Sequence, residues 1–486
     1  MQTAGQYDKL DVSEMAELQQ LSDITEGIMN INDTLYYLNI GLPEDILRRK
    51  YYGDFDGAIG LINRRLSMNS IPAPLRACLT AQREIIRRLP EDYPYTRAEA
   101  LHILRRHISD FSEEEFDERV DAGEIGWIYV KGEPRYFKEF FPTLVKTDPD
   151  FARRAGIRLD GAEGNFTEAA HLHRMRRILQ ETGRFSNRIR IRASIRLKDT
   201  EFTPGMFLRV HLPIPSDCPE QTEIKIEKIY PENGMIAPSD AIQRTVCWEE
   251  HMEENHPFVV EYSYVYTAVY HDISKMKADL SQPSLCTEEQ PPHIVFTPYI
   301  RALAASLTEG LSDPLQKARA FYDFITLNMK YTFMPAYFVL ENIPETCARN
   351  FSGDCGIFSL LFITLCRAVG IPAQWQSGMA AEPDFACAHD WARFYIAPYG
   401  WLSADPSYGV AAVKAGSEES RRFYFGNLDS FRMVANNGFQ APFTVPKLQW
   451  RADPYDNQEG EAESDTQGFN FSQLERCTEV LSYEEL

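Results

Sequence analysis

The feature that most constrains the fold is an apolar stretch that begins at Cys355. Residues 357–365 read Ile-Phe-Ser-Leu-Leu-Phe-Ile-Thr-Leu. A helix of this sequence is apolar on nearly all sides, and such a helix is buried in a core. Asn-Phe-Ser-Gly-Asp precedes the cysteine, so Cys355 stands at the helix start, where the helix dipole favours an anionic sulfur. The sequence therefore predicts a reactive thiol held rigidly at the edge of a core.

Two later residues complete a chemical pattern with this thiol. His389 occurs in Ala-His-Asp-Trp and Asp405 in Ser-Ala-Asp-Pro, each at the edge of a predicted short strand. In thiol enzymes a histidine exchanges the proton, and a carboxylate fixes the tautomer of the imidazole. We therefore predict that Cys355 is a nucleophile, His389 its base and Asp405 the residue that orients the base.

Neighbouring residues are candidates for supporting roles. The backbone N–H of Cys355 would face an oxyanion, and Tyr331 is a candidate second donor, although an ordinary core aromatic is an equally good interpretation. Asp354, Gly356 and Trp391 are candidates for the lining of a substrate groove. Cys387 lies two residues before the histidine, but the spacing is not that of a metal site and no Cys-x-x-Cys occurs. We predict no metal and no cofactor.

Composition limits the class of partner and the location. With 44 % hydrophobic and 25 % charged residues the chain of 486 residues reads as a folded protein. Its formal net charge of -21 disfavours nucleic acid and anionic membranes as partners, and a protein or peptide substrate is expected. No secretory signal and no run of about 18 apolar residues is evident. The nine scattered cysteines are expected to be reduced, in a cytoplasmic protein.

Changes of pattern along the chain predict four regions and an α+β fold class. Residues 1–185 read mainly helical. From residue 186 apolar residues alternate with the arginines of 188–196, which predicts a strand with one basic face and a small antiparallel β domain over 186–271. Residues 292–440 read as a helical and antiparallel catalytic domain. Residues 441–486 are acidic and are expected to form a partly disordered tail.

Four motifs in the third region closely resemble the transglutaminase-like superfamily. They are Gly353-Asp-Cys355, Leu365-Cys-Arg-Ala-Val-Gly-Ile-Pro-Ala373, His389-Asp-Trp391 and Gly400-Trp-Leu-Ser-Ala-Asp-Pro406. The resemblance covers residues 292–410 and implies a papain-like core with the roles given above for the cysteine, histidine and aspartate. The segment Val210-His-Leu-Pro-Ile-Pro215 also resembles the β domain that accompanies this core in many bacterial members.

The resemblance also has departures that affect the expected activity. Animal transglutaminases carry Gln and Trp beside the nucleophile, where this chain has Asp354 and Gly356, and they use calcium. Calcium-activated cross-linking is therefore not implied, and bacterial members look more often like thiol hydrolases or amidases. We expect a cysteine enzyme that acts on a peptide or carboxamide bond through a thioester, by hydrolysis or by acyl transfer to an amine. The alternative is a catalytically weak relative that serves as a protein-binding or scaffold module.

Overall fold

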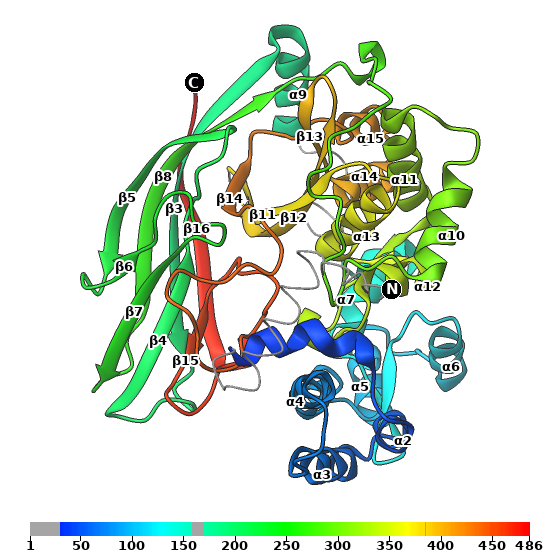
Figure 1. Ribbon diagram of the computed structural model, residues 1–486, viewed down its shortest axis with the longest axis vertical. Coiled ribbons are helices and arrows are strands. Elements are labelled where there is room, and N and C mark those ends of the chain that lie inside the picture. The colour runs from blue at the N-terminus through cyan, green and yellow to red at the C-terminus, as the bar shows by residue number, and fades with distance from the viewer. Residues whose placement is uncertain (1–29, 158–169, 384) are drawn as a thin grey trace, which may run out of the picture. The chain divides into compact units, whose positions relative to one another are not determined.

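The computed structural model describes residues 30–157, 170–383 and 385–486 (Figure 1). The chain divides into two compact units, residues 1–90 with 129–133 and residues 91–128 with 134–486. The boundary expected at residue 185 therefore does not separate compact units, because the helices after residue 91 belong with the rest of the chain. The first 29 residues, where no secretory signal was expected, lie outside the described residues.

The described part of the first unit is helical except for residues 129–133, which belong to a β-hairpin. Its helices are η1 (Ile31–Ile40), α2 (Glu44–Tyr52), α3 (Phe55–Leu66) and α4 (Ala73–Arg88). Asp54 caps α3 by accepting a hydrogen bond from the N–H of Gly57 at 3.0 Å, which satisfies a free donor of the first turn. The apolar face of α4 is buried through Cys78, Leu79 and Ile85.

The second unit begins with short helices around an aromatic core. Phe116, Phe140 and Phe151 are buried together there. A capping box of Thr96 and Glu99 starts the first of these helices. The elements are α5 (Arg97–His107), α6 (Glu113–Asp121), β1 (Trp127–Val130), β2 (Glu133–Tyr136), α7 (Phe140–Thr147), α8 (Pro149–Arg154) and α9 (Ala170–Thr182).

The predicted β region forms two four-stranded antiparallel sheets, in the orders β16-β3-β8-β5 and β15-β4-β7-β6. Trp248 on one sheet and Phe258 on the other meet with ring centroids 5.5 Å apart, so the inner faces share a core. The strands are β3 (Arg184–Leu197), β4 (Met206–Pro213), β5 (Gln221–Tyr230), β6 (Met235–Ile236), β7 (Thr245–Met252), β8 (Phe258–Val269), β15 (Glu461–Glu463) and β16 (Leu474–Glu485).

The C-terminal residues 441–486 are not the partly disordered tail that their composition suggested. They supply β15 and β16, and β16 pairs with β3 along almost its whole length. Glu475 faces Arg196 at 2.7 Å and Glu484 faces Arg188 at 3.2 Å. Opposite charges on adjacent strands stabilise their pairing. The acidic segment is therefore ordered by the basic face of β3, and those arginines have ion-pair partners within the chain.

The third region holds a four-stranded antiparallel sheet in the order β13-β12-β11-β14. Figure 1 shows helices gathered on one side of this sheet. Its strands are β11 (Ala373–Glu382), β12 (Phe385–Ile396), β13 (Gly400–Ala404) and β14 (Arg432–Asn436). Around it lie α10 (Pro298–Leu307), α11 (Pro314–Asn328), β9 (Lys330–Tyr331), η4 (Tyr337–Val339), α12 (Ile343–Asn350), β10 (Ser352–Gly353), α13 (Cys355–Ala368), α14 (Pro406–Lys414) and α15 (Glu418–Phe423).

Helix α13 is the centre of this region, as its apolar sequence predicts. Asp354 caps it by accepting a hydrogen bond from the N–H of Ile357 at 3.2 Å. Every residue from Gly356 to Arg367 is buried. Gly370, with φ of 78°, ends the helix in the left-handed conformation that glycine adopts without strain. The fold is thus α+β, with a papain-like core. Within the described ranges, no helix combines the length and the hydropathy that crossing a membrane requires.

Candidate active site

The structure brings His389 and Asp405 together. Asp405 follows β13, whose Ala404 pairs with Ala392 on β12, so the aspartate lies beside the strand that carries the histidine. Its Oδ1 accepts the N–H of Tyr408 at 3.0 Å and caps α14, while its Oδ2 meets Nε2 of His389 at 2.7 Å. Both side chains are buried, with 5 % of His389 and none of Asp405 exposed. A proton held on Nε2 leaves Nδ1 as the basic nitrogen.

A buried arginine that sequence analysis missed supports this pair. Arg432 on β14 donates from Nη1 to Oδ2 of Asp405 at 2.9 Å and from Nε to Oδ2 of Asp429 at 3.0 Å. Its guanidinium also lies 4.4 Å from the ring centroid of Tyr408. Burial alone would raise the pKa of Asp405, but the charges of His389 and Arg432 hold it well below its usual value. Asp405 therefore stays ionised and can orient the imidazole.

Cys355 contacts the residue next to His389. As the first residue of α13 it is partly exposed, and its Sγ donates a hydrogen bond to Oδ2 of Asp390 at 3.3 Å. Among the described residues no hydrogen bond joins this sulfur to the imidazole of His389. Burial, followed by the neighbouring carboxyl groups of Asp390 and Asp354, raises the pKa of the Cys355 thiol well above its usual value. The helix start and these surroundings therefore act on the thiol in opposite directions.

The three candidates for the lining of a groove have other roles in the structure. Trp391 is fully buried, and its Nε1 donates to Oε1 of Gln376 at 2.7 Å, so it packs behind the site and does not line a groove. Asp354 caps α13 and accepts a hydrogen bond from the hydroxyl of Tyr337. A Cβ at Gly356 would collide with that hydroxyl and with Asp390. Glycine is required there because these side chains approach the backbone closely.

Tyr331 lies beside the sulfur, where an oxyanion donor would be needed. Burial raises its pKa well above the usual value, and interactions with Cys355 and Asp354 raise it further. Lys146, from α7, places its ammonium 3.8 Å from the centroid of the Tyr331 ring. Burial lowers the pKa of Lys146, while the neighbouring thiols of Cys355 and Cys387 act in the opposite direction. A cation from the N-terminal region thus approaches the site.

Sequence reasoning missed three residues that shape the site: Lys146, Asp390 and Arg432. Asp390 lies inside the His-Asp-Trp motif, and its position next to the histidine was the signal that could have found it. The other two come from distant segments with no motif of their own. Among the residues that the structure describes, no group of three or more His, Cys, Asp or Glu side chains is arranged to hold a metal ion.

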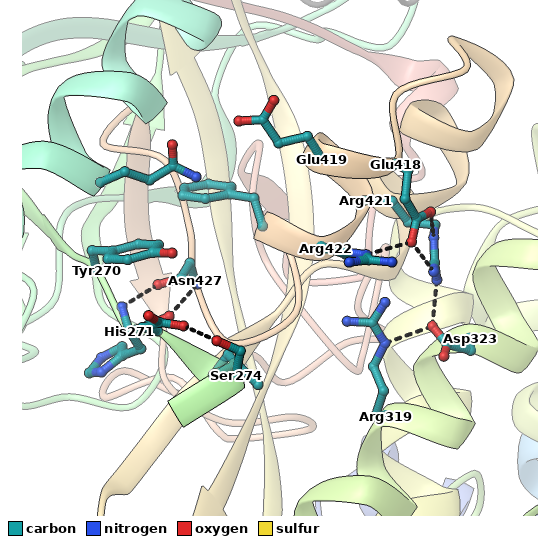
Figure 2. A pocket seen from close by; sticks show the side chains of 14 residues that line it. Tyr270, His271, Ser274, Arg319, Asp323, Glu418, Glu419, Arg421, Arg422 and Asn427 are labelled. Carbon is teal, nitrogen blue, oxygen red and sulfur yellow. Dashed lines mark hydrogen bonds and ion pairs between the residues drawn. The ribbon is translucent and has the colours of Figure 1, made fainter. Parts of the chain in front are cut away.

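A separate pocket of about 560 Å³ lies between α11, α15 and residues 270–274 (Figure 2). Its charged lining is internally paired: Arg319 binds Asp323 at 2.7 Å, and Arg421 binds Glu418 at 2.6 Å. The hydrogen bond from Arg421 lowers the pKa of Glu418 to about 2. The predicted catalytic residues do not line this pocket.

On its papain-like core the structure joins His389 to Asp405 and places Cys355 against Asp390. Residues 301–406 match the model of the transglutaminase-like superfamily, which confirms the resemblance noted in the motifs. A protein-glutamine gamma-glutamyltransferase from Pseudomonas aeruginosa is 28 % identical over 136 residues, which are 25 % of this chain and 20 % of that protein. The chain therefore matches only a fifth of the length of this relative.

Two solved structures share parts of the chain's arrangement. A Cytophaga hutchinsonii protein, named a candidate cysteine protease, has a TM-score of 0.35 and 12 % identity, and the match covers 63 % of this chain and 90 % of that one. The periplasmic domain of TgpA from Pseudomonas aeruginosa, bound to ethylmercury, has a TM-score of 0.25 and 17 % identity, with coverage of 47 % and 93 %.

Proposed function

We propose that this protein is a cysteine enzyme that cleaves a peptide or side-chain carboxamide bond through a thioester. The observation that carries the proposal is the buried hydrogen bond between Nε2 of His389 and Asp405, with Cys355 against the next residue of the same strand. A histidine held in one tautomer by a carboxylate is what a thiol needs as its proton acceptor. The match to the transglutaminase-like superfamily supports the same chemistry.

The proposed reaction begins when the S–H of Cys355 turns from Asp390 to Nδ1 of His389 and gives up its proton. The sulfur attacks the carbonyl carbon, and the C–S bond forms as the carbonyl oxygen becomes an oxyanion. The backbone N–H of Cys355 and the hydroxyl of Tyr331 would donate hydrogen bonds to that oxygen. Collapse breaks the C–N bond, and His389 returns the proton to the departing amine.

The thioester that remains can follow two courses. Attack by water releases an acid, and attack by an amine forms a new amide; in both cases His389 removes the proton and the thiol is regenerated. The name of the curated relative makes a protein-bound glutamine the first acyl donor to examine. A protein or peptide partner, a cytoplasmic location and the lack of nucleic-acid and membrane partners stay predictions.

The test uses a glutamine-containing peptide as acyl donor, with and without hydroxylamine as acceptor. The proposal expects ammonia release by the parent chain and loss of that release in Cys355→Ala. Hydroxamate formation would identify acyl transfer, and ammonia release without it would identify hydrolysis. A library of peptides and simple amides that gives no Cys355-dependent amine release would contradict the enzyme proposal.

The contact of the Cys355 sulfur with Asp390, in place of a hydrogen bond to His389, favours one second candidate, a weakly catalytic protein-binding module. Iodoacetamide separates the two, because it reacts with thiolate and requires no substrate recognition. If the protein is an enzyme of the proposed kind, iodoacetamide should alkylate Cys355 faster at pH 6 in the folded chain than in the urea-unfolded chain. A slower reaction in the folded chain would support the binding module.

A further inference from the structure

The carboxyl group that contacts the sulfur of Cys355 has a second buried carboxyl group beside it. Asp390 on β12 touches Sγ through Oδ2, and Asp456 comes from the segment before β15. Both are buried, with 5 % and 4 % of their surfaces exposed, and their carboxyl groups interact directly. Two carboxylates in such a site cannot both be ionised, so they hold at least one proton between them.

The sheet register brings these two side chains together. Ser377 on β11 is the cross-strand partner of Asp390 on β12. The hydroxyl of Ser377 donates a hydrogen bond to Oδ1 of Asp456 at 2.8 Å. Asn436 on β14 donates to the same Oδ1 at 2.6 Å. Asp456 is therefore anchored by two adjacent strands, β11 and β14, through one of its oxygens, and the second oxygen takes part in neither hydrogen bond.

The hydrogen-bond donors decide which carboxyl group carries the proton. Oδ1 of Asp456 also accepts the N–H of Asn457 at 2.9 Å, so three donors favour the ionised form of Asp456. Its buried Oδ2 has no hydrogen-bond partner among the described groups, and a carboxyl proton on Asp390 would supply one. Asp390 accepts only from Gln458 and from the weak S–H donor.

We propose that Asp456 keeps Asp390 protonated, so that a neutral carboxylic acid, and not a carboxylate, lies against the sulfur of Cys355. The inference rests on the proposed role of Cys355 as nucleophile and adds two positioning residues to it. A carboxylate at this distance from the sulfur would oppose formation of the thiolate. The Asp390–Asp456 pair removes that charge while it keeps the hydrogen bond that orients the thiol.

The electrostatic surroundings agree with this assignment. Burial, with the charges of Asp456 and Asp354, raises the pKa of Asp390 well above its usual value. Other titratable or charged groups also face the sulfur and its carboxyl partners: Asp354 on the helix cap, Tyr337, Tyr331, Lys146, Arg451 and Asp453. Burial raises the pKa of Asp354 to about 6 and that of Asp453 to about 7, so both change charge near or below neutral pH and the comparison belongs at pH 8.

The test measures the rate at which iodoacetamide alkylates Cys355 in the full chain at pH 8, by peptide mass spectrometry. The exposed Cys477 is the internal control, and its rate should be the same in every variant. In Asp456→Asn, Asp390 loses its charged neighbour and ionises, so alkylation should slow at least tenfold, which corresponds to about one unit of thiol pKa. In Asp390→Asn the group beside the sulfur stays neutral, so the rate should change less than about threefold.

The double variant Asp390→Asn/Asp456→Asn separates charge from structural damage. It should regain a rate within about threefold of Asp390→Asn, because no carboxylate is then left beside the sulfur. If Cys355 is alkylated tenfold or more faster in Asp390→Asn than in the parent, Asp390 is a carboxylate in the parent and the proposal is overturned. An unchanged alkylation rate in Asp456→Asn would also overturn it, as would a slow rate in Asp456→Asn that the added Asp390→Asn substitution does not restore. Alkylation needs no turnover, so absence of amine release would refute the proposed function and leave this result standing.

Discussion

Replacing Arg432 by methionine tests whether the histidine–aspartate pair depends on a buried cation. The side chain of Arg432 is fully buried and binds two carboxylates, Asp405 and Asp429, each also buried. Removing one partner of a buried ion pair costs about 3–5 kcal/mol, because a charge remains in a low-dielectric site. We expect the free energy of unfolding to fall by an amount in that range. It should not fall by the larger sum over the individual hydrogen bonds, because a carboxylate that has lost the arginine can take up a proton.

The same reasoning gives the pH dependence its sign. In the parent the pKa of Asp405 is lowered, so its stabilising contribution is present above the unfolded pKa of about 3.9 and is lost as pH falls through the folded pKa. In Arg432→Met the folded pKa of Asp405 rises, so the variant gains stability, relative to the parent, as pH falls from 8 to 5. The loss caused by the substitution should therefore be smaller at pH 5.

Urea unfolding, followed by circular dichroism at pH 5 and pH 8, measures the loss of stability and its pH dependence. The midpoint and the slope of each transition together give the free energy of unfolding. Arg188→Met is the matched control, because Arg188 also bridges two carboxylates, Glu223 and Glu484, but lies on an exposed face of β3. We expect no measurable shift of its midpoint. An Arg432→Met midpoint equal to that of the control, or an equal loss at both pH values, would refute the reasoning.

Three further perturbations have defined outcomes. Asp405→Asn should lower the rate of amine release by about 10³–10⁴ because the imidazole tautomer is no longer fixed, as a steady-state assay would show; a rate within tenfold of the parent would argue against the pair. Gly356→Ala should destabilise the chain by about 1–3 kcal/mol in urea, since the new Cβ meets Tyr337 and Asp390, and an unchanged midpoint would contradict the close approach. Deleting residues 474–486 should expose the edge of β3 and cause aggregation, measured by light scattering, whereas a soluble chain with an unchanged circular dichroism spectrum would mean that β16 is dispensable.

The parts of the fold that the sequence predicts are those with strong local periodicity. The all-round apolar pattern after Cys355 gave the buried helix, and the alternation from residue 186 gave β3. The acidic C-terminal segment could not be placed in this way, because its order comes from pairing with arginines almost 300 positions earlier. Composition reports the charge of a segment, but not whether an oppositely charged strand lies beside it.

The candidate site shows the same division. His389 and Asp405 were predictable because each stands in a motif at a strand edge, and the structure joins them at 2.7 Å. The charge around the sulfur was not predictable, because Lys146 approaches the sulfur from one distant segment and Asp456 approaches Asp390 from another. A helix N-terminus favours a thiolate only when no nearby carboxyl group outweighs it, and that balance depends on tertiary contacts.

Trapping the acyl-enzyme tests the central claim, that Cys355 accepts an acyl group with His389 as its base. The full chain is mixed with p-nitrophenyl acetate at pH 7, quenched in acid and analysed by intact mass and peptide mapping. The account predicts one acetyl group on the peptide that contains Cys355, none on it in Cys355→Ala, and strongly slowed acetylation in His389→Ala. Acetylation of other residues alone, or equal acetylation of Cys355 with and without His389, would contradict it.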